Sequence, residues 1–342
     1  MKKTLPPQQF HSKLVQWATK YGRHDLPWQL NPTPYSVHIS EIMLQQTQVL
    51  TVIPYYQRWM ESFPNLEALA QANEDEVMLH WQGLGYYSRA RNLQKAAQYL
   101  IKEFSGHYPK TLKQIEQIPG IGRYTAGAIV SFAYNEPGPI VDGNVRRLFC
   151  RYFAIEGVPT TTAVNRQLWD YAQQYTLAND CRAYAQSLLD MGATLCTAKN
   201  PNCPHCPLIA TCQAHQTGRT AKLPTPKPKK HQPVKAACFY WIQQQNKLYL
   251  QKRPSPGIWG GLWCLPQAND HEIAEPRPAL GYFKHTFSHY KLDAQVVPSD
   301  KSDHHSGAFF NREQIETLGL PTPIRIFIER HWPQSRDSLN SE

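Results

Sequence analysis

The sequence predicts a mainly α-helical region followed by a smaller α+β domain. Apolar residues such as Phe10, Leu14 and Trp17 recur at three- and four-residue spacing in the first two thirds of the chain, which places them on one face of a helix. Residues 224–235, PTPKPKKHQPVK, contain four prolines and four lysines, so we expect an extended linker there. Beyond the linker, ACFYWIQ and KLYLQKR have the pattern of two short strands joined as a hairpin across QQNK.

The length and charge of the chain limit its number of domains and the kind of partner that it binds. A chain of 342 residues suits two or three domains. Its formal net charge of +10 favours a polyanionic partner such as nucleic acid, although many basic proteins bind none. The N-terminus lacks the apolar run of a signal peptide, and no segment approaches the roughly 20 apolar residues that span a bilayer. We therefore expect a soluble, intracellular protein that does not associate with membranes.

Four of the eight cysteines form a spaced cluster. Cys196, Cys203, Cys206 and Cys212 follow the pattern C-x6-C-x2-C-x5-C, and intracellular thiols of this kind bind metal more often than they form disulfides. Zinc sites usually pair two C-x2-C units, so the wide, unequal outer gaps favour a [4Fe–4S] cluster. Spacing alone leaves zinc and four unpaired thiols open. The other four cysteines lie in apolar contexts and are expected to be buried thiols.

A glycine-containing turn separates two predicted helices. Thr111 and Gln114 have the spacing of a capping box, and the helix that they open should end near Pro119. Gly120 and Gly122 allow a tight turn that presents backbone N–H groups at the start of the next helix, which begins at Arg123 and runs to about residue 134. Such amides can bind a phosphate oxygen, although an isolated PGIG segment is equally a simple connector between helices.

Several segments together identify a family. PYSVHISEIMLQQTQV, GLGYYSRARNL, IPGIGRYTAGAI and VDGNVRRL, with the cysteine spacing, resemble successive motifs of adenine DNA glycosylases, the MutY family of the endonuclease III superfamily. FKHTFSHYKL extends the match, and GIWGGLWCLPQ resembles the Nudix fold. The resemblance implies a helix–hairpin–helix glycosylase region over 1–223, with six helices at about 31–139 and the [4Fe–4S] cluster in 140–223. The linker 224–235 and a Nudix-like domain over 236–342 would follow.

The resemblance assigns catalytic roles to four residues. Glu41 would be the acid that protonates adenine, and its apolar neighbours should raise its pKa. Asp142 would stabilise the positively charged sugar and help to position water with Tyr124 and Asn144, although an Asp before a helix is more often a simple N-cap. Endonuclease III has a nucleophilic lysine where this chain has Tyr124, and a phenol cannot form an imine. We therefore expect base hydrolysis without strand cleavage.

The resemblance also assigns residues to base and DNA binding. Taken singly, Leu26, Trp28 and Tyr86 would be ordinary core side chains. Ser288 and His289 would be polar residues on an ordinary strand. In the family, Gln46 and Tyr86 match positions that wedge into the duplex. Arg146, Arg147 and Arg151 are either phosphate contacts or surface charges. The implied adenine pocket is His24, Leu26, Trp28 and Gln186; the DNA-binding residues are Gln46, Thr47, Tyr86, Gly120, Gly122 and Arg123; the 8-oxoguanine contacts are Phe287, Ser288 and His289.

The sequence thus predicts a monofunctional adenine DNA glycosylase. Its partner would be double-stranded DNA containing adenine opposite 8-oxoguanine or guanine, and we expect a monomer in a bacterial-type cytoplasm. The segment QANDHEIAEPRP, beginning at Gln267, lacks the glutamate-rich helix that binds magnesium in Nudix hydrolases, so no diphosphate hydrolysis is expected. Two alternatives remain open: a lyase of the same fold that acts on another lesion, and a non-catalytic DNA-binding scaffold with structural zinc.

Overall fold

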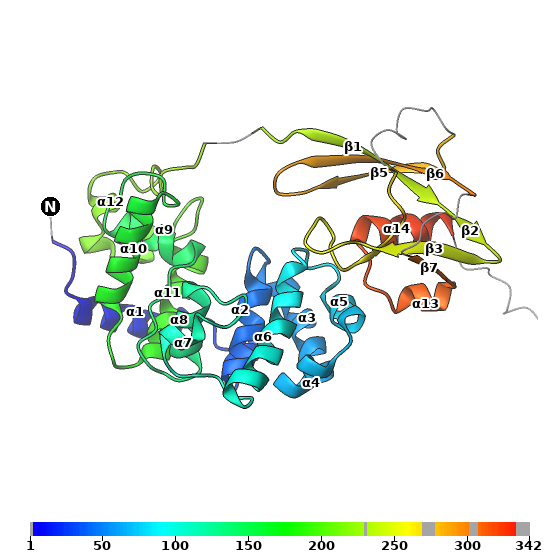
Figure 1. The fold of residues 1–342 in the computed structure, drawn as a ribbon. Helices are drawn as coiled ribbons and strands as arrows, with labels where there is room; N and C mark the ends of the chain where they lie inside the picture. The colour runs from blue at the N-terminus through cyan, green and yellow to red at the C-terminus, as the bar shows by residue number, and fades with distance from the viewer. Residues whose placement is uncertain (1–2, 229–230, 269–277, 301–306, 333–342) are drawn as a thin grey trace, which may run out of the picture. The chain divides into compact units, whose positions relative to one another are not determined.

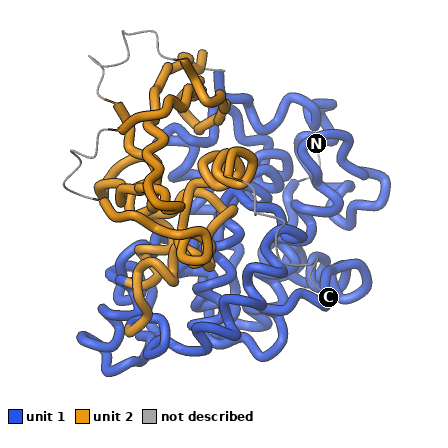
Figure 2. Tube along the Cα trace, turned by 90° about the vertical axis from the view of Figure 1, so that its right-hand side faces the viewer, with its two compact units in different colours: residues 1–70, 95–229 blue, residues 71–94, 230–342 orange. Residues whose placement is uncertain are grey.

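A computed structural model describes residues 3–228, 231–268, 278–300 and 307–332. The segment after Ala268 that bears on magnesium binding therefore lies outside the described residues. The chain divides into two compact units (Figure 2). Residues 1–70 and 95–229 make up the first unit, and residues 71–94 and 230–342 the second.

Helices build the first unit, as the apolar spacing predicts (Figure 1). Phe10 and Leu14 of α1 are fully buried, and α1 packs against α10 and α11. The helices are α1 (Pro7–Tyr21), α2 (Pro34–Leu44), α3 (Val49–Ser62), α4 (Leu66–Gln71), α7 (Leu112–Ile115), α8 (Arg123–Phe132), α9 (Gly143–Tyr152), α10 (Thr162–Tyr175), α11 (Cys181–Asp190) and α12 (Gln213–Gln216), with short turns η1 (Pro27–Gln29), η2 (Met191–Leu195), η3 (Cys203–His205) and η4 (Ile209–Thr211).

The glycine turn joins α7 to α8. Thr111 caps α7 by accepting a hydrogen bond from the backbone N–H of Gln114. The helix is shorter than the sequence predicts, because it ends at Ile115 and the chain continues to Gly120 in turns. Gly120 has a φ of +81°, a conformation that glycine adopts without a steric penalty. The turn therefore requires glycine at this position.

Two small sheets build most of the second unit (Figure 1). β1 (Val234–Trp241) pairs in parallel with β6 (Lys291–Pro298), which pairs antiparallel with β5 (Gly281–Thr286). The other sheet contains β2 (Gln243–Gln244), β3 (Lys247–Lys252), β4 (Trp263–Cys264) and β7 (Gly307–Phe310). Helices α13 (Arg312–Glu316) and α14 (Thr322–His331) complete the fold, with α14 against β5.

The predicted hairpin between the first two strands is correct only at its tip. Gln245 and Asn246 both have positive φ, as a two-residue hairpin turn requires, and β2 pairs antiparallel with β3. The long strand β1 instead belongs to the other sheet, where its last five residues are buried. Buried strands pair in parallel more often than exposed ones, and local sequence does not encode that partner.

Residues 71–94 of the helical sequence belong to the second unit. This segment contains α5 (Glu74–Trp81) and the start of α6 (Ser88–Phe104). Within the unit, Lys252 Nζ lies 2.7 Å from Asp75 Oδ1, and Gln82 Oε1 accepts hydrogen bonds from the Leu320 N–H and Arg325 Nη2. A Cβ at Gly319 would lie 2.7 Å from Met78 Cβ, so the two backbones approach closely. Among the described residues, no helix combines the length and the apolar character needed to cross a membrane.

Candidate functional site

A cavity of about 440 Å³ opens in the first unit. It is bounded by α2, α11, the end of α1 and the segment before η1. Leu26 and Trp28 are almost fully buried and present their side chains to this space. All four residues of the expected adenine pocket line the cavity, together with Glu41: His24, Leu26, Trp28 and Gln186.

Glu41 lies on α2 within an apolar wall of the cavity and is only 5% exposed. Its Oε2 accepts a 2.6 Å hydrogen bond from the Tyr124 hydroxyl, which comes from the first turn of α8. Burial, with a smaller contribution from the negative charge of Asp142, raises the pKa of Glu41 to about 7, although the Tyr124 hydrogen bond opposes the rise. A group with this pKa is partly protonated at neutral pH and can donate a proton.

Asp142 caps α9 and is held in place by its neighbours. Its Oδ1 accepts the Val145 N–H at 2.7 Å and its Oδ2 accepts Asn144 Nδ2 at 2.9 Å. Burial raises the pKa of Asp142, and these hydrogen bonds and the positive charge of Arg147 oppose that rise. The expected N-cap geometry is therefore present, and it holds the carboxylate close to Glu41 and Tyr124.

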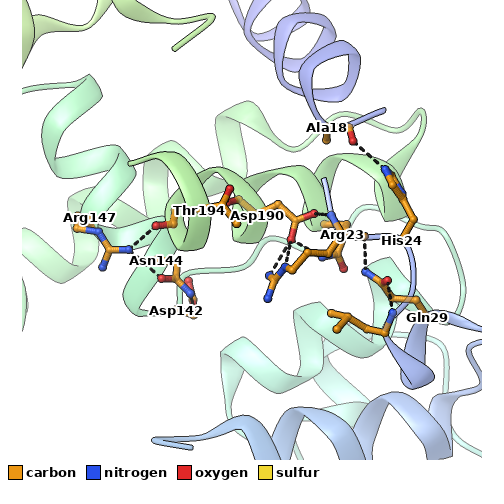
Figure 3. Close-up of polar contacts among 12 residues, drawn as sticks. Ala18, Arg23, His24, Gln29, Asp142, Asn144, Arg147, Asp190 and Thr194 are labelled. Atoms are coloured by element: carbon orange, nitrogen blue, oxygen red, sulfur yellow. Dashed lines mark hydrogen bonds and ion pairs between the residues drawn. The ribbon is translucent and has the colours of Figure 1, made fainter. Parts of the chain in front are cut away.

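Arg147 links Asn144 to the loop that carries the cysteines. Its Nη2 donates to Asn144 Oδ1 at 2.9 Å (Figure 3). The same nitrogen donates to the Gly192 carbonyl at 2.6 Å, and Nε donates to the Cys196 carbonyl at 2.7 Å. Nε and Nη2 of Arg147 are thus bonded within the protein, which favours a structural role over a phosphate contact. The same holds for Arg151, which is 2% exposed and donates to the carbonyls of residues 197, 198 and 223.

The cavity wall contains a buried ion pair that the sequence pattern did not predict. Asp190, at the end of α11, is fully buried. Its Oδ1 lies 2.7 Å from both Nε and Nη2 of Arg23 (Figure 3). The same oxygen accepts Gln186 Nε2 at 2.9 Å. The only local signal was an acid directly after two leucines on an amphipathic helix, which is also the pattern of an ordinary helix end.

The four clustered cysteines line a second, smaller pocket in the first unit. Its wall is largely apolar, with Leu148, Leu195 and Leu208. Arg151 Nη1 lies 3.4 Å from the sulfur of Cys196. Among the residues that the structure describes, no three His, Cys, Asp or Glu side chains are close enough to hold one metal ion. Four thiols spread around one pocket fit a cubane cluster, in which each thiolate binds a different corner iron, better than a single zinc ion.

The residues expected to contact DNA lie in exposed or strained positions. Gly122 caps α8, and the space where its Cβ would be is open. Arg123 lies with its guanidinium 4.0 Å from the centroid of the Trp169 ring. Gln46 and Tyr86 have φ values of 58° and 48°, conformations that cost free energy in residues other than glycine and that cluster at functional sites. Gln46 and the adjacent Thr47 belong to the first unit, and Tyr86 to the second.

The expected 8-oxoguanine contacts form the tip of the β5–β6 hairpin. The Phe287 N–H donates to the Tyr290 carbonyl at 2.9 Å, which leaves Ser288 and His289 exposed at the turn. The Phe287 ring lies 5.3 Å from Trp259 and 4.7 Å from Tyr290. The aromatic anchor thus holds two hydrogen-bonding side chains toward solvent.

Two family models match the chain. One, described as HhH-GPD superfamily base excision DNA repair protein, covers residues 39–174, and the other, described as NUDIX domain, covers residues 237–330. The adenine DNA glycosylase of Buchnera aphidicola subsp. Acyrthosiphon pisum is 36% identical over 338 residues, which cover 94% of this chain and 97% of the relative. The chain belongs to the adenine DNA glycosylase family.

Other relatives agree with this assignment. The adenine DNA glycosylase of Rattus norvegicus is 36% identical, over 84% of this chain and 69% of the relative. A solved structure of a thermostable thymine-DNA glycosylase superposes with a TM-score of 0.57 at 26% identity, over 62% of this chain and 97% of that one. As an adenine DNA glycosylase, the protein is a hydrolase of base excision repair, and the predicted fold class, helical with a Nudix-like C-terminal domain, is confirmed.

Proposed function

We propose that this adenine DNA glycosylase hydrolyses the N-glycosidic bond of adenine opposite 8-oxoguanine or guanine in duplex DNA, without cutting the strand. The observation that carries the proposal is a pair of carboxyl groups in different surroundings beside a base-sized cavity. Glu41 is buried and accepts a hydrogen bond from the Tyr124 hydroxyl, while Asp142 is surrounded by hydrogen-bond donors. Such different surroundings support an acid role for Glu41 and an electrostatic role for Asp142.

The reaction would start with the adenine out of the stack and in the cavity. Glu41 would transfer its proton to N7 of the base, because the adenine anion is a poor leaving group. The C1′–N9 bond would then break with both electrons passing to the base. Asp142 would stabilise the positive charge that develops on the sugar. Because Asp142 is largely buried, water would screen this interaction little.

Water would complete the reaction. Its oxygen would add to C1′ and its proton would pass to a carboxylate of the pair, so that the products are free adenine and an abasic sugar. Tyr124 and Asn144 would keep the two carboxyl groups in position through their hydrogen bonds. Because Tyr124 has no amine, no imine to C1′ can form at this position, which supports hydrolysis alone over the lyase alternative.

The chemistry of the donor set supports a [4Fe–4S] cluster on Cys196, Cys203, Cys206 and Cys212. When bound, the cluster supplies four covalent links that hold residues 196–212 as one loop. The loop carbonyl of Cys196 accepts a hydrogen bond from Arg147. The cluster would therefore contribute to the order of α9, the helix that Asp142 caps.

Duplex DNA would be bound by both parts of the chain. The open N-terminus of α8 at Gly120, Gly122 and Arg123 would hold a phosphate. Gln46 and Tyr86 would wedge into the duplex, and Thr47 would also contact the DNA. We propose the boundaries 1–223 for the glycosylase region, 224–235 for the linker and 236–342 for the Nudix-like domain that reads 8-oxoguanine through Phe287, Ser288 and His289. The protein would act as a monomer in a bacterial-type cytoplasm.

One set of measurements tests the proposal. Single-turnover excision is followed on duplexes with adenine opposite 8-oxoguanine, guanine, cytosine and thymine; rapid release only for the first two supports it. Glu41→Gln should keep mismatch affinity and lose excision, and near-normal turnover would remove Glu41 from its role. Strong covalent capture of an abasic strand by borohydride would favour the lyase. A colourless protein that contains zinc would contradict the cluster.

A further inference from the structure

The orientation of the Gln186 amide is fixed from behind by the buried ion pair. Asp190 accepts two guanidinium N–H groups and the backbone N–H of Arg23, so both of its oxygens face donors and act as acceptors. The atom of Gln186 that lies 2.9 Å from Asp190 Oδ1 must then be the amide nitrogen. Its other end, Oε1, accepts no hydrogen bond from the residues that the structure describes.

The free amide oxygen belongs to a side chain that lines the cavity. A primary amide offers a donor on one side and an acceptor on the other, and without a fixed neighbour it turns over at little cost. Asp190 uses the donor, so only the acceptor is left for a bound base. An adenine presents an amino group at C6, which is a donor, whereas hypoxanthine presents a carbonyl oxygen there, which is an acceptor.

We propose that Asp190, held by Arg23, is a positioning residue that sets base specificity by making Gln186 an acceptor. This inference rests on the proposed adenine pocket and adds to it the group that decides between 6-amino and 6-oxo purines. A bound 6-oxo purine would bring its oxygen toward the Gln186 oxygen, and two acceptors facing each other in a buried site are unfavourable.

The test replaces the ion pair by apolar side chains. The double variant Arg23→Met with Asp190→Leu leaves no buried charge without a partner, so it should still fold. In this variant the Gln186 amide is free to turn. Excision is measured in single turnover for adenine, hypoxanthine and unsubstituted purine, each opposite 8-oxoguanine. In the double variant, the ratio of the adenine rate to the purine rate should fall about tenfold, and the ratio of the hypoxanthine rate to the purine rate should rise. Loss of packing alone would change all three rates in the same direction.

Two further variants make the test specific. In Asp190→Asn the guanidinium of Arg23 selects the amide oxygen of the new side chain, so an acceptor still faces Gln186 and the preference for adenine should persist. Adding Gln186→Glu to the double variant supplies a side chain that has only acceptors and needs no orientation, so the adenine preference should return. Ser187→Ala, on the same helix but outside the cavity lining, is the matched control and should leave the ratios unchanged.

The outcomes separate this inference from the proposed function. A wild-type protein that does not excise adenine contradicts the proposed function itself. A wild-type protein that prefers adenine, with a double variant whose adenine-to-hypoxanthine ratio stays within twofold of it, overturns the role of Asp190 alone. If the double variant gives no cooperative melting transition, Asp190→Ala replaces it, and added formate, an acceptor that fits the vacated carboxylate site, should restore the adenine preference.

Discussion

The hydrogen bond between Tyr124 and Glu41 should influence how the rate of adenine excision depends on pH. The Tyr124 hydroxyl donates to the carboxylate, so it stabilises the ionised form and limits to about 7 a pKa that burial raises. Tyr124→Phe removes that stabilisation. Hydrogen bonds to charged groups contribute about 1.5 to 3 kcal/mol, and about 1.4 kcal/mol corresponds to one pKa unit, so the pKa of Glu41 should rise to about 8 or above.

The consequence appears on the alkaline side of the profile. Because the proposed mechanism uses protonated Glu41 as the acid, the rate should fall as the pH rises through its pKa. At pH 8 a group of pKa 7 is protonated in about one molecule in eleven, and a group of pKa 8 in about one in two. Tyr124→Phe should therefore keep about five times more of its own plateau rate at pH 8 than the wild type keeps.

The assay is single-turnover adenine release between pH 5 and 9, at enzyme concentrations below saturation so that the profile reports the free enzyme. Each profile is normalised to its own plateau, because the variant can also lose rate at every pH. Tyr134→Phe removes a hydroxyl that donates to the Tyr108 carbonyl, away from the cavity lining, and should leave the profile in place. An alkaline limb that does not move in Tyr124→Phe, or that moves to lower pH, would refute the reasoning.

Three further predictions follow from the site. Glu41→Gln should raise the melting temperature more at pH 8 than at pH 4. The pKa of the Glu41 carboxyl rises from 4.5 to about 7 on folding, so up to about 3 kcal/mol of folding stability is lost when the pH rises above that range. Calorimetry that shows equal gains at both pH values would contradict this. Arg147→Gln should lower the excision rate about a hundredfold with DNA affinity retained, and a parallel loss of both would argue for a folding defect. Ser288→Ala with His289→Ala should reduce the ratio of excision opposite 8-oxoguanine to excision opposite guanine, and an unchanged ratio would exclude the tip as the reader.

Features encoded by local sequence were predictable. The apolar spacing of Phe10 and Leu14 identified α1, whose buried face carries both residues. The apolar neighbours of Glu41 predicted a raised pKa, and the structure has it. The position of Asp142 before a helix predicted a cap, and the Val145 N–H makes the expected bond. The catalytic assignments themselves required the family motifs, because single residues of these types are common in helices.

Features that depend on distant segments were not predictable. Arg23 and Asp190 are 167 positions apart, and neither lies in a pattern that indicates a buried ion pair. The parallel pairing of β1 with β6 joins strands about fifty residues apart, while the sequence of β1 is equally suited to a hairpin. Arg147 and Arg151 were candidates for phosphate contacts because charge alone says nothing of the carbonyl groups that a loop brings to a guanidinium.

The two-part composition of the second unit has a consequence for how the chain matures during synthesis. Residues 71–94 and the segment from residue 230 onward make up that unit and are separated by residues 95–229, which are 135 positions. At about 5 to 20 residues per second, the ribosome needs roughly 7 to 27 s to make the intervening stretch. Throughout that interval α5 lacks the partners of Asp75, Met78 and Gln82. The segment that carries Tyr86 thus reaches its final environment only after the C-terminal domain has emerged.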